Sequence, residues 1–401
     1  MTENMNLLFN QIKTMILGRF KDTIPTINEI YKEAESLRKT FKSICPVSDD
    51  EFISIKNRLT EEICHSIGFE ETTLTCRDSE QTKGWYFLNK GDGFYWARFK
   101  EYISNKRSGD IATKLDKITD NIMDNLGNPK SSAHFQRRGL LLGDVQSGKT
   151  ATYTAICNKA ADAGYKVIII LAGIMDILRI QTQERLDAEF VGLDSKYSLD
   201  NKANNAMKNK LVGVGKRKRD DQHRITRFTS VKTDFSRPII ESCGLNLHDL
   251  KGTAFFVVKK NKSILNNLQK WLTKDEEILD LPLLLIDDEA DNASVNTNSE
   301  EHDPTAINAA INKILRSFKQ ASYLGITATP FANIFIDPDI DKDGAAKDLF
   351  PKHFITLLPT PDNYIGAKDI FKNDEGDLEE NKCNLPPYDK ALITIEEKEQ
   401  E

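Results

Sequence analysis

The stretch Gly139-Leu140-Leu141-Leu142-Gly143-Asp144-Val145-Gln146-Ser147-Gly148-Lys149-Thr150 decides the fold of this chain. It reads as a buried strand, a turn with a glycine at each end and the start of a helix, and it completes the phosphate-loop pattern G-x-x-x-x-G-K-[ST]. Glycines let backbone N–H groups turn inward around phosphate oxygens, and the helix N-terminus adds positive potential. We expect Lys149 to reach the β- and γ-phosphates and the Thr150 hydroxyl to bind Mg²⁺. The nucleotide-binding residues predicted are Gly143, Asp144, Val145, Gln146, Ser147, Gly148, Lys149 and Thr150.

A chance Gly-Lys-Thr turn is the alternative explanation of this pattern. The apolar run Leu140–Leu142 supplies the strand that the motif requires, and the residues from Ala151 continue it as a helix that ends near Gly164. This context favours nucleotide binding.

The composition is that of an ordinary water-soluble chain. Its 401 residues suit two or three domains. The net charge is −6, so any contact with nucleic acid must come from a local basic surface. The six cysteines form no C-x-x-C pair, and we expect reduced thiols in the cytoplasm. Neither a signal peptide nor a run of transmembrane length is recognisable, so we expect no membrane contact.

Residues 1–130 are predicted to form a mostly helical N-terminal domain. Apolar residues recur at helical spacing from Met5 to about Ile67, and a break with an N-cap signal lies at Pro46–Asp50. The segment Gly84–Phe99 is rich in aromatic residues. Such a cluster is more often core than a platform for stacking bases, and we expect core.

From Arg137 to Phe335 short apolar runs alternate with helical patterns, which predicts a doubly wound α/β domain with a parallel sheet. The expected strands are Gly139–Leu142, Lys166–Leu171, Thr253–Val258, Leu283–Asp287 and Tyr323–Thr327. A basic insertion at residues 195–237 fits a solvated loop and a nucleic-acid contact equally well. Residues 337–401 are acidic and contain prolines, which predicts an acidic linker or the start of a missing second lobe.

The run Leu283-Leu284-Leu285-Ile286-Asp287-Asp288-Glu289-Ala290-Asp291 is an apolar strand that ends in acids. Carboxylates at this edge of a parallel sheet lie beside the phosphate loop. One carboxylate can hold Mg²⁺, and an adjacent glutamate can orient the attacking water. We assign Asp288 to the metal and Glu289 to water activation, with Asp287 as a competitor for the metal. A solvated acidic turn is the alternative.

A third element is Gly325-Ile326-Thr327-Ala328-Thr329-Pro330, in which a strand delivers two hydroxyls before Pro330 halts regular structure. Thr327 and Thr329 can hydrogen-bond the acidic cluster and report the state of the γ-phosphate to moving parts. Alone, the string also fits a simple strand end. The order of the three motifs, and the long intervals between them, suit a motor-type core better than a kinase or a small GTPase.

With these motifs the chain resembles superfamily-two helicases and translocases. The first RecA-like lobe of that group carries a phosphate loop, a D-E-A-D-type strand end and an S/T-A-T motif in this order, and Asp288–Asp291 spells the second. A closer resemblance is to the Z-one domain family, described as endonucleases or helicase-like ATPases of bacterial restriction-type systems. It is carried by GDVQSGKT (143–150), AADAGYKVIIILAG (160–173), LRIQTQERLDAEFVG (178–192), LIDDEADNASVNT (285–297), GITATPFANIFI (325–336) and the lead-in run Tyr95-Trp96-Ala97-Arg98.

The resemblance implies that residues 131–336 are a RecA-like P-loop ATPase lobe that binds Mg·ATP. Its catalytic residues are then Lys149, Asp288, Glu289, Thr327 and Thr329. Members of the Z-one family lie beside methylases and histidine-kinase-type ATPases in defence-like gene sets. The resemblance therefore implies a restriction or antiphage role with such proteins as partners.

The resemblance also implies DNA contact near Arg179, Gln181 and Gln183, because these residues follow the second strand of the lobe. From the residues alone, the three side chains fit a polar helix face equally well. In the motors that the chain resembles, this position touches the nucleic-acid backbone.

One departure concerns the second lobe. A complete motor needs a further lobe of roughly 150 residues that supplies an arginine finger, but only about 70 residues follow Pro330. We therefore expect a second lobe or a partner subunit to complete the site. An intrinsic nuclease is a second hypothesis, although Asp337-Pro338-Asp339 has no E-x-K partner and reads as an acidic turn. A module that senses nucleotide without translocating is the third.

Overall fold

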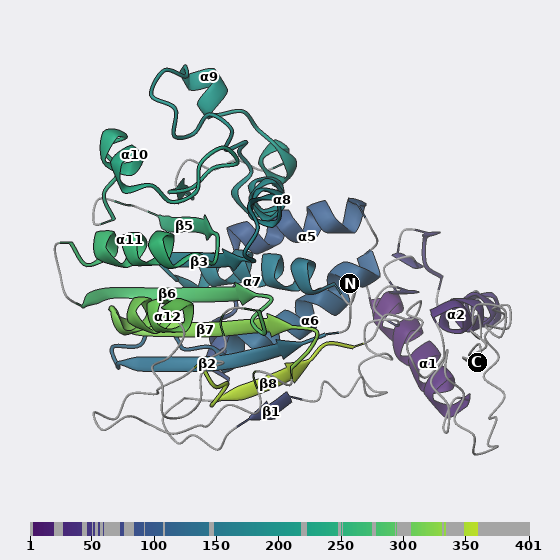
Figure 1. The fold of residues 1–401 in the computed structure, drawn as a ribbon. Helices are drawn as coiled ribbons and strands as arrows, with labels where there is room; N and C mark the ends of the chain where they lie inside the picture. Colours follow the sequence, from purple (N-terminus) through teal and green to yellow (C-terminus); the bar gives the residue numbers. More distant parts are fainter. Residues whose placement is uncertain are drawn as a thin grey trace, which may run out of the picture.

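The apolar runs of the sequence lie side by side in one eight-stranded sheet in the computed structural model of this protein. The structure describes residues 3–19, 27–41, 46–49, 51–52, 55–56, 59, 73–75, 84–91, 93–106, 109–143, 148–217, 223–247, 250, 252–274, 278–292, 294, 306–330, 333 and 349–359. The architecture is α/β, as predicted, with a mostly parallel sheet covered by helices on both faces (Figure 1).

The sheet order places the three motifs on neighbouring strands. The strands are β1 (Thr73–Thr75), β2 (Phe135–Leu142), β3 (Val167–Ala172), β4 (Ile225–Arg227), β5 (Thr253–Val258), β6 (Leu279–Asp288), β7 (Phe318–Thr327) and β8 (Phe354–Leu357). They follow one another as β1-β8-β2-β7-β6-β3-β5-β4, and the pairs are parallel except that β1 runs against β8. The phosphate-loop strand β2 and the acid-bearing strand β6 are thus separated only by β7, which ends at Thr327 two residues before Thr329.

The described helices lie before, between and around these strands. They are α1 (Glu3–Arg19), α2 (Ile27–Phe41), α4 (Trp85–Asn89), α5 (Phe94–Lys106), α6 (Gly109–Asn125), α7 (Lys149–Ala163), α8 (Asp176–Leu186), α9 (Asn205–Lys208), α10 (Arg237–Ser242), α11 (Lys262–Leu272) and α12 (Ala306–Arg316). A π-helical segment, Asp187–Val191, continues α8, and a 3₁₀ turn spans Gly213–Lys216. None of the helices in the described part of the chain is long and apolar enough to cross a membrane.

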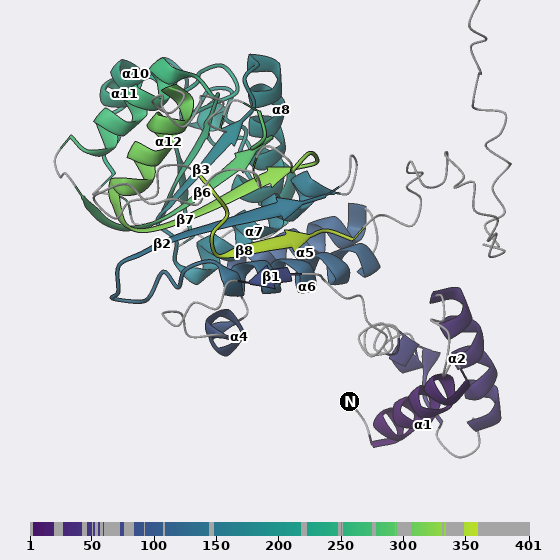
Figure 2. The same cartoon turned by 60° about the horizontal axis from the view of Figure 1, so that its bottom comes forward.

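Alternate residues of each central strand face opposite sides of the sheet, as strand geometry requires. Ile168 and Ile170 of β3 belong to a core with α7, whereas Val167, Ile169 and Leu171 belong to a second core with α10, α11 and α12. Figure 2 shows these helices on opposite sides of the sheet. Strands buried on both faces explain why the sequence shows continuous apolar runs instead of alternation.

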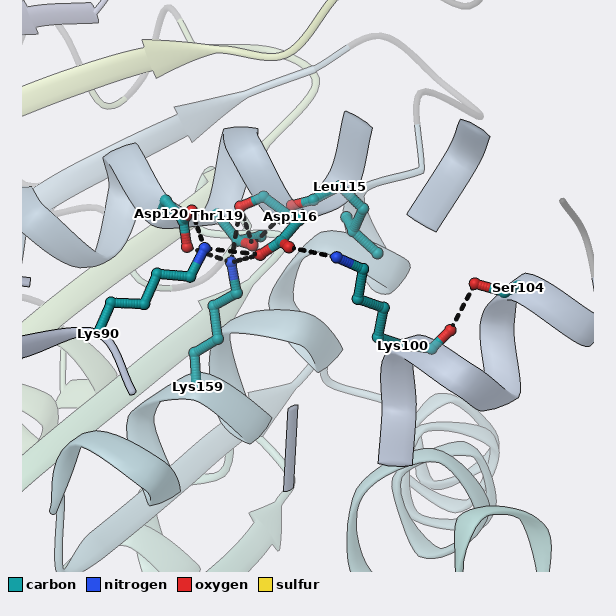
Figure 3. A network of polar contacts seen from close by, with 8 residues as sticks. All are labelled: Lys90, Lys100, Ser104, Leu115, Asp116, Thr119, Asp120 and Lys159. Carbon is teal, nitrogen blue, oxygen red and sulfur yellow. Dashed lines mark hydrogen bonds and ion pairs between the residues drawn. The ribbon is translucent and has the colours of Figure 1, made fainter. Parts of the chain in front are cut away.

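The helices α4, α5 and α6 form an outer layer over α7. Their aromatic residues are buried at Trp85, Tyr86, Phe94, Tyr95, Trp96 and Phe99, which confirms the prediction of core, although Phe87 is exposed. Charged groups also join the layers. The ammonium of Lys159, in α7, is buried between Asp116 and Asp120 of α6 (Figure 3).

The N-terminal helices have an apolar cluster of their own. Leu8, Ile12 and Ile16 of α1 lie in it with Phe52 and Leu59. The predicted cap at the break is present, because the Ser48 hydroxyl accepts a hydrogen bond from the Glu51 N–H at 3.2 Å and the Glu51 carboxylate accepts one from the Ser48 N–H at 3.0 Å.

The sheet extends beyond the expected lobe boundaries. β1 comes from the region assigned to the N-terminal domain and β8 from the region assigned to an acidic linker or the start of a second lobe. β8 pairs in parallel with β2, and a Cβ on Gly139 would overlap the Phe354 ring. Gly139 is thus required for this strand to pack. β4 likewise lies inside the predicted insertion, where no strand was expected.

Candidate nucleotide site

The two ends of the phosphate loop are held by the neighbouring elements. The Gly143 N–H donates to the Thr327 carbonyl at 3.2 Å, and Lys149 Nζ donates to the Gly143 carbonyl at 2.8 Å. Gly148 begins α7 with φ 85°, a left-handed conformation that favours glycine. Residues 144–147 of the predicted loop lie outside the described residues. Thr150 is half-buried in the first turn of α7.

The strand register brings the motifs level at one edge of the sheet. Leu142 pairs with Thr327, and Asp288 pairs with Ile326 of the same strand. Since neighbouring strands lie about 5 Å apart, the last residue of β2 and the Asp288 backbone are on the order of 10 Å apart. A triphosphate and its metal ion fit within that span.

Asp287 and Asp288 occupy different environments although they are neighbours. Asp287 is fully buried. Its Oδ2 accepts a hydrogen bond from the Tyr323 hydroxyl at 2.8 Å, and its Oδ1 lies 2.7 Å from Nζ of the buried Lys260. The second contact is an ion pair, because Oδ1 accepts no hydrogen bond from any described group. Both oxygens are therefore engaged inside the protein, which favours Asp288 over Asp287 as the metal ligand.

The Asp288 carboxyl is half-buried at the end of β6. Burial, reinforced by the negative charge of Glu289 and opposed by Lys260, raises the pKa of Asp288 to about 6. The buried hydroxyl of Tyr153, on α7, is close enough to this carboxyl to lower its pKa in part. A largely buried carboxyl with a raised pKa at the end of β6 fits a site for a cation.

The described residues contain no cluster of three or more side chains that would form a metal cage by themselves. Mg²⁺ does not require one, because in nucleotide sites it binds one or two protein oxygens, phosphate oxygens and water. With a nucleotide bound, Asp288 and Thr150 could therefore hold the ion as its protein ligands.

Glu289 lies at the turn after β6 with its side chain exposed. It has φ 56° and is the only described residue other than glycine with a positive φ. A Cβ on Gly173, at the end of β3, would lie 3.5 Å from Glu289 Oε2. The carboxylate thus reaches over the end of the neighbouring strand, in a position open to solvent and to substrate.

The two threonines bind the acidic turn, as predicted, but through a residue without an assigned role. Thr327 Oγ1 donates to Asp291 Oδ1 and Thr329 Oγ1 donates to Asp291 Oδ2, both at 2.6 Å. The Thr329 N–H also donates to Thr327 Oγ1 at 2.9 Å. Asp291 therefore joins the turn after β6 to the end of β7, and its place in the D-E-A-D string was the signal that could have identified it.

The residues proposed to contact DNA have different surroundings. Arg179 is buried and donates to the Ser230 carbonyl at 2.9 Å and to the Val231 carbonyl at 3.0 Å. Gln183 is buried between Asp187 and Thr229. These two side chains hold a loop in place and are not available on the surface, whereas Gln181 is exposed and stays a predicted contact.

The basic insertion is tied to the rest of the protein. Lys210 lies 3.2 Å from Asp194 and Arg217 lies 2.7 Å from Glu101, so acidic groups neutralise part of its charge. A cavity of about 450 Å³ between α5 and the insertion is lined in part by Arg98 and Arg227. Both guanidinium groups donate to backbone carbonyls, so they serve the fold there. None of the described site residues lines this cavity.

A parallel sheet with a phosphate loop after β2, acids after β6 and threonine hydroxyls on the strand between them defines a helicase-like P-loop ATPase of RecA-like fold. The chain belongs to the family described as "Type III restriction enzyme, res subunit", whose model matches residues 114–332, more than half of the chain. The protein is thus a helicase-like ATPase of the kind found in restriction systems. The narrower resemblance to the Z-one family stays a prediction.

The other comparisons are less informative. A solved chain described as "The Structure Of A DnaB-Like Replicative Helicase And Its Interactions With Primase" is 11% identical, with a TM-score of 0.28, and the match covers 89% of this chain and 80% of that one. This likeness is too distant to support an argument. No curated protein matches the chain.

Proposed function

We propose that this chain binds Mg·ATP at the edge formed by β2, β7 and β6 and hydrolyses it as the first motor lobe of a DNA-processing restriction enzyme. The observation that carries the proposal is the alignment of the Leu142, Thr327 and Asp288 strand ends on three adjacent strands. In such an arrangement one bound triphosphate can contact the phosphate loop, the acids and the threonines together.

Each side chain then has a role in ATP hydrolysis. Lys149 and the loop N–H groups bind the phosphates, while Thr150 and Asp288 would hold Mg²⁺, which neutralises charge developing on the transferred phosphoryl group. Glu289 orients the attacking water from its exposed turn. Asp291, with Thr327 and Thr329, connects that turn to β7. Movement on β7 can thereby follow the state of the γ-phosphate.

A second lobe or partner subunit completes the active site by adding an arginine finger, a contribution on the order of 10³ or more in rate. The isolated chain should therefore bind ATP and hydrolyse it slowly. Robust DNA-stimulated turnover by the isolated chain would refute this expectation. DNA, rather than RNA, is the substrate consistent with a res subunit, and a role in antiphage defence alongside a methylase follows from the same proposal.

The test compares Lys149→Ala and Glu289→Gln with the wild-type chain. Lys149→Ala should bind fluorescent ATP much more weakly than wild type. Glu289→Gln should bind ATP with normal affinity but should not hydrolyse it in a single turnover. Lys130→Ala, at an exposed lysine, is the matched control and should behave as wild type. Normal binding by Lys149→Ala would contradict the proposal. The pair Asp337 and Asp339 lies outside the described residues, so no described feature favours an intrinsic nuclease.

A further inference from the structure

We infer that Lys260 is a positioning residue for Glu289, and that Asp287 serves to hold Lys260 in place. The inference rests on the proposed function, because it gives Glu289 its role in hydrolysis. It gives a role to the buried charges of Lys260 and Asp287, neither of which takes part in the proposed binding of the phosphates.

The Lys260 ammonium has three partners, one at the end of β6 and two in the turn that follows it. Nζ donates to the Glu289 carbonyl at 2.5 Å and to the Asn292 carbonyl at 3.1 Å, and it pairs with Asp287 Oδ1 at 2.7 Å. The side chains of Lys260 and Asp287 are both fully buried. Lys260 therefore holds the turn by two hydrogen bonds and is itself tied to the end of β6 by the ion pair with Asp287.

The turn needs such a tie because its backbone is strained. A positive φ is uncommon for a residue with a side chain and persists where surrounding contacts impose it. Glu289 has φ 56°. Lys260 holds its carbonyl from one side, and on the other side the Ala290 N–H donates to the Ile326 carbonyl at 2.9 Å. The conformation that projects the Glu289 carboxylate is thus set by a lysine and a neighbouring strand.

Lys260 itself is anchored at the end of β5. Its N–H donates to the Gly173 carbonyl at 2.8 Å, where β3 ends. Gly173 is also the residue over which the Glu289 carboxylate lies. Gly173 therefore has two roles. Its carbonyl fixes the backbone of the lysine that holds the Glu289 carbonyl, and its lack of a side chain leaves room for the Glu289 carboxylate.

This arrangement predicts an effect on the chemical step and not on ATP affinity. In the proposed site the phosphates bind at the loop after β2, and none of the described contacts of Lys260 involves Gly143, Gly148 or Lys149. A displaced Glu289 would instead lose its alignment with the attacking water. Misplacement by about 1 Å can cost about 10²-fold in rate. A variant that lowers kcat without changing ground-state affinity has lost an interaction made in the transition state.

The experiment measures ATP affinity and single-turnover hydrolysis for the full chain carrying Lys260→Met. We expect a 10- to 100-fold slower rate with an ATP Kd within about threefold of wild type. Lys259→Met is the matched control, because the adjacent lysine pairs with Asp176 at 3.0 Å and has no described contact with the acidic turn. It should hydrolyse ATP at the wild-type rate.

The double variant Lys260→Met/Asp287→Asn removes both buried charges and keeps the test valid if Lys260→Met fails to fold. If Lys260 positions Glu289, the double variant stays slow with normal ATP affinity. Recovery of the wild-type rate would show that the lysine merely neutralises Asp287, and a wild-type rate for Lys260→Met would likewise overturn the inference. Failure of the proposed function is distinguishable, because wild type would then bind no ATP, and the inference falls with it.

Discussion

The Lys159 ammonium lies 2.7 Å from Asp116 Oδ1 and joins two layers of the protein, since Lys159 belongs to the phosphate-loop helix α7 and Asp116 to α6. The lysine side chain is fully buried, and burial lowers the pKa of Lys159. Burial alone would raise the pKa of Asp116, but the positive charges and hydrogen bonds of Lys159 and Lys100 outweigh it and lower that pKa to about 2. The helix that presents Lys149 is thus held by a charged contact at its far end.

Replacing Lys159 with Met should lower the free energy of unfolding by up to about 3–5 kcal/mol, because Asp116 and Asp120 lose their fully buried counter-charge and keep only the partly exposed Lys90 and Lys100. Urea unfolding at pH 7 measures the change. Lys100→Met is the control, since Lys100 also contacts Asp116 but is 43% exposed. It should cost no more than about 1 kcal/mol. Equal losses in the two variants would contradict the structural role given to Lys159.

Asp187 should make the stability depend on pH. Burial, opposed by hydrogen bonds from Ser195 and Gln183, raises the pKa of Asp187 to about 6, compared with about 3.9 in an unfolded chain. Because the folded state binds this proton more tightly, the stabilisation is fully present below about pH 4 and is lost as the pH rises through 6. Relative to Asp187→Asn, wild type should lose roughly 1 kcal/mol between pH 5 and pH 7.

The measurement is urea unfolding of wild type and Asp187→Asn at both pH values. Other titrating groups are common to the two proteins, so the difference between them isolates Asp187. A difference that does not change with pH would show that Asp187 titrates normally.

Asp288 should make Mg²⁺ binding depend on pH, because a divalent cation binds only the ionised carboxylate. With a pKa of about 6 for the metal-free group, Mg²⁺ affinity in the presence of ADP should be constant above about pH 7 and fall up to tenfold per unit below pH 6. Calorimetric titration with Mg²⁺ at pH 5 to 8 measures it. In Asp288→Asn the protonation of ADP still affects Mg²⁺ affinity, but the contribution of the Asp288 carboxyl to its pH dependence should be absent. If wild type and Asp288→Asn show the same dependence of Mg²⁺ affinity on pH, Asp288 is not a metal ligand.

Arg179 should behave as a structural residue. Arg179→Met removes hydrogen bonds to the Ser230 and Val231 carbonyls and should lower the free energy of unfolding by about 2–4 kcal/mol. An arginine that contacts a DNA phosphate contributes about one to the slope of log affinity against log salt. We therefore expect an unchanged slope for folded Arg179→Met in fluorescence anisotropy with duplex DNA. A slope reduced by one would return Arg179 to the interface.

The five predicted strands are all present, but three short strands, β1, β4 and β8, were not predicted, and the ends of the predicted strands were misplaced. Each apolar run is a strand buried on both faces, so composition alone was enough to locate it. β2 begins earlier than expected because its polar residues bond to neighbours: Gln136 donates to the Leu315 and Phe318 carbonyls, and Arg138 donates to Asn312. A polar residue satisfied by tertiary contacts cannot be recognised from hydrophobicity.

The site was predictable where a motif fixes the spacing and unpredictable where distant segments meet. Lys149, Asp288 and Thr327 follow from strand ends in a parallel sheet. Lys260 belongs to no motif. The only sign of its role in the sequence is that it follows an apolar strand of the same sheet as the strand that ends in acids. Arg179 and Gln183 have the spacing of a polar helix face, but polarity does not reveal whether that face meets solvent or a buried loop.

The contact between Phe354 and Gly139 has a consequence for synthesis and trimming of the protein. During synthesis, all three motifs have been made once residue 330 has emerged from the ribosome. The edge of β2 that pairs with β8 stays without a partner until Phe354–Leu357 has been made. Unpaired strand edges invite pairing with other chains. A polypeptide that ends at residue 336, where the recognisable motifs end, would contain all the motif residues but leave one edge of β2 unpaired and prone to aggregation. Expression boundaries therefore belong beyond residue 359.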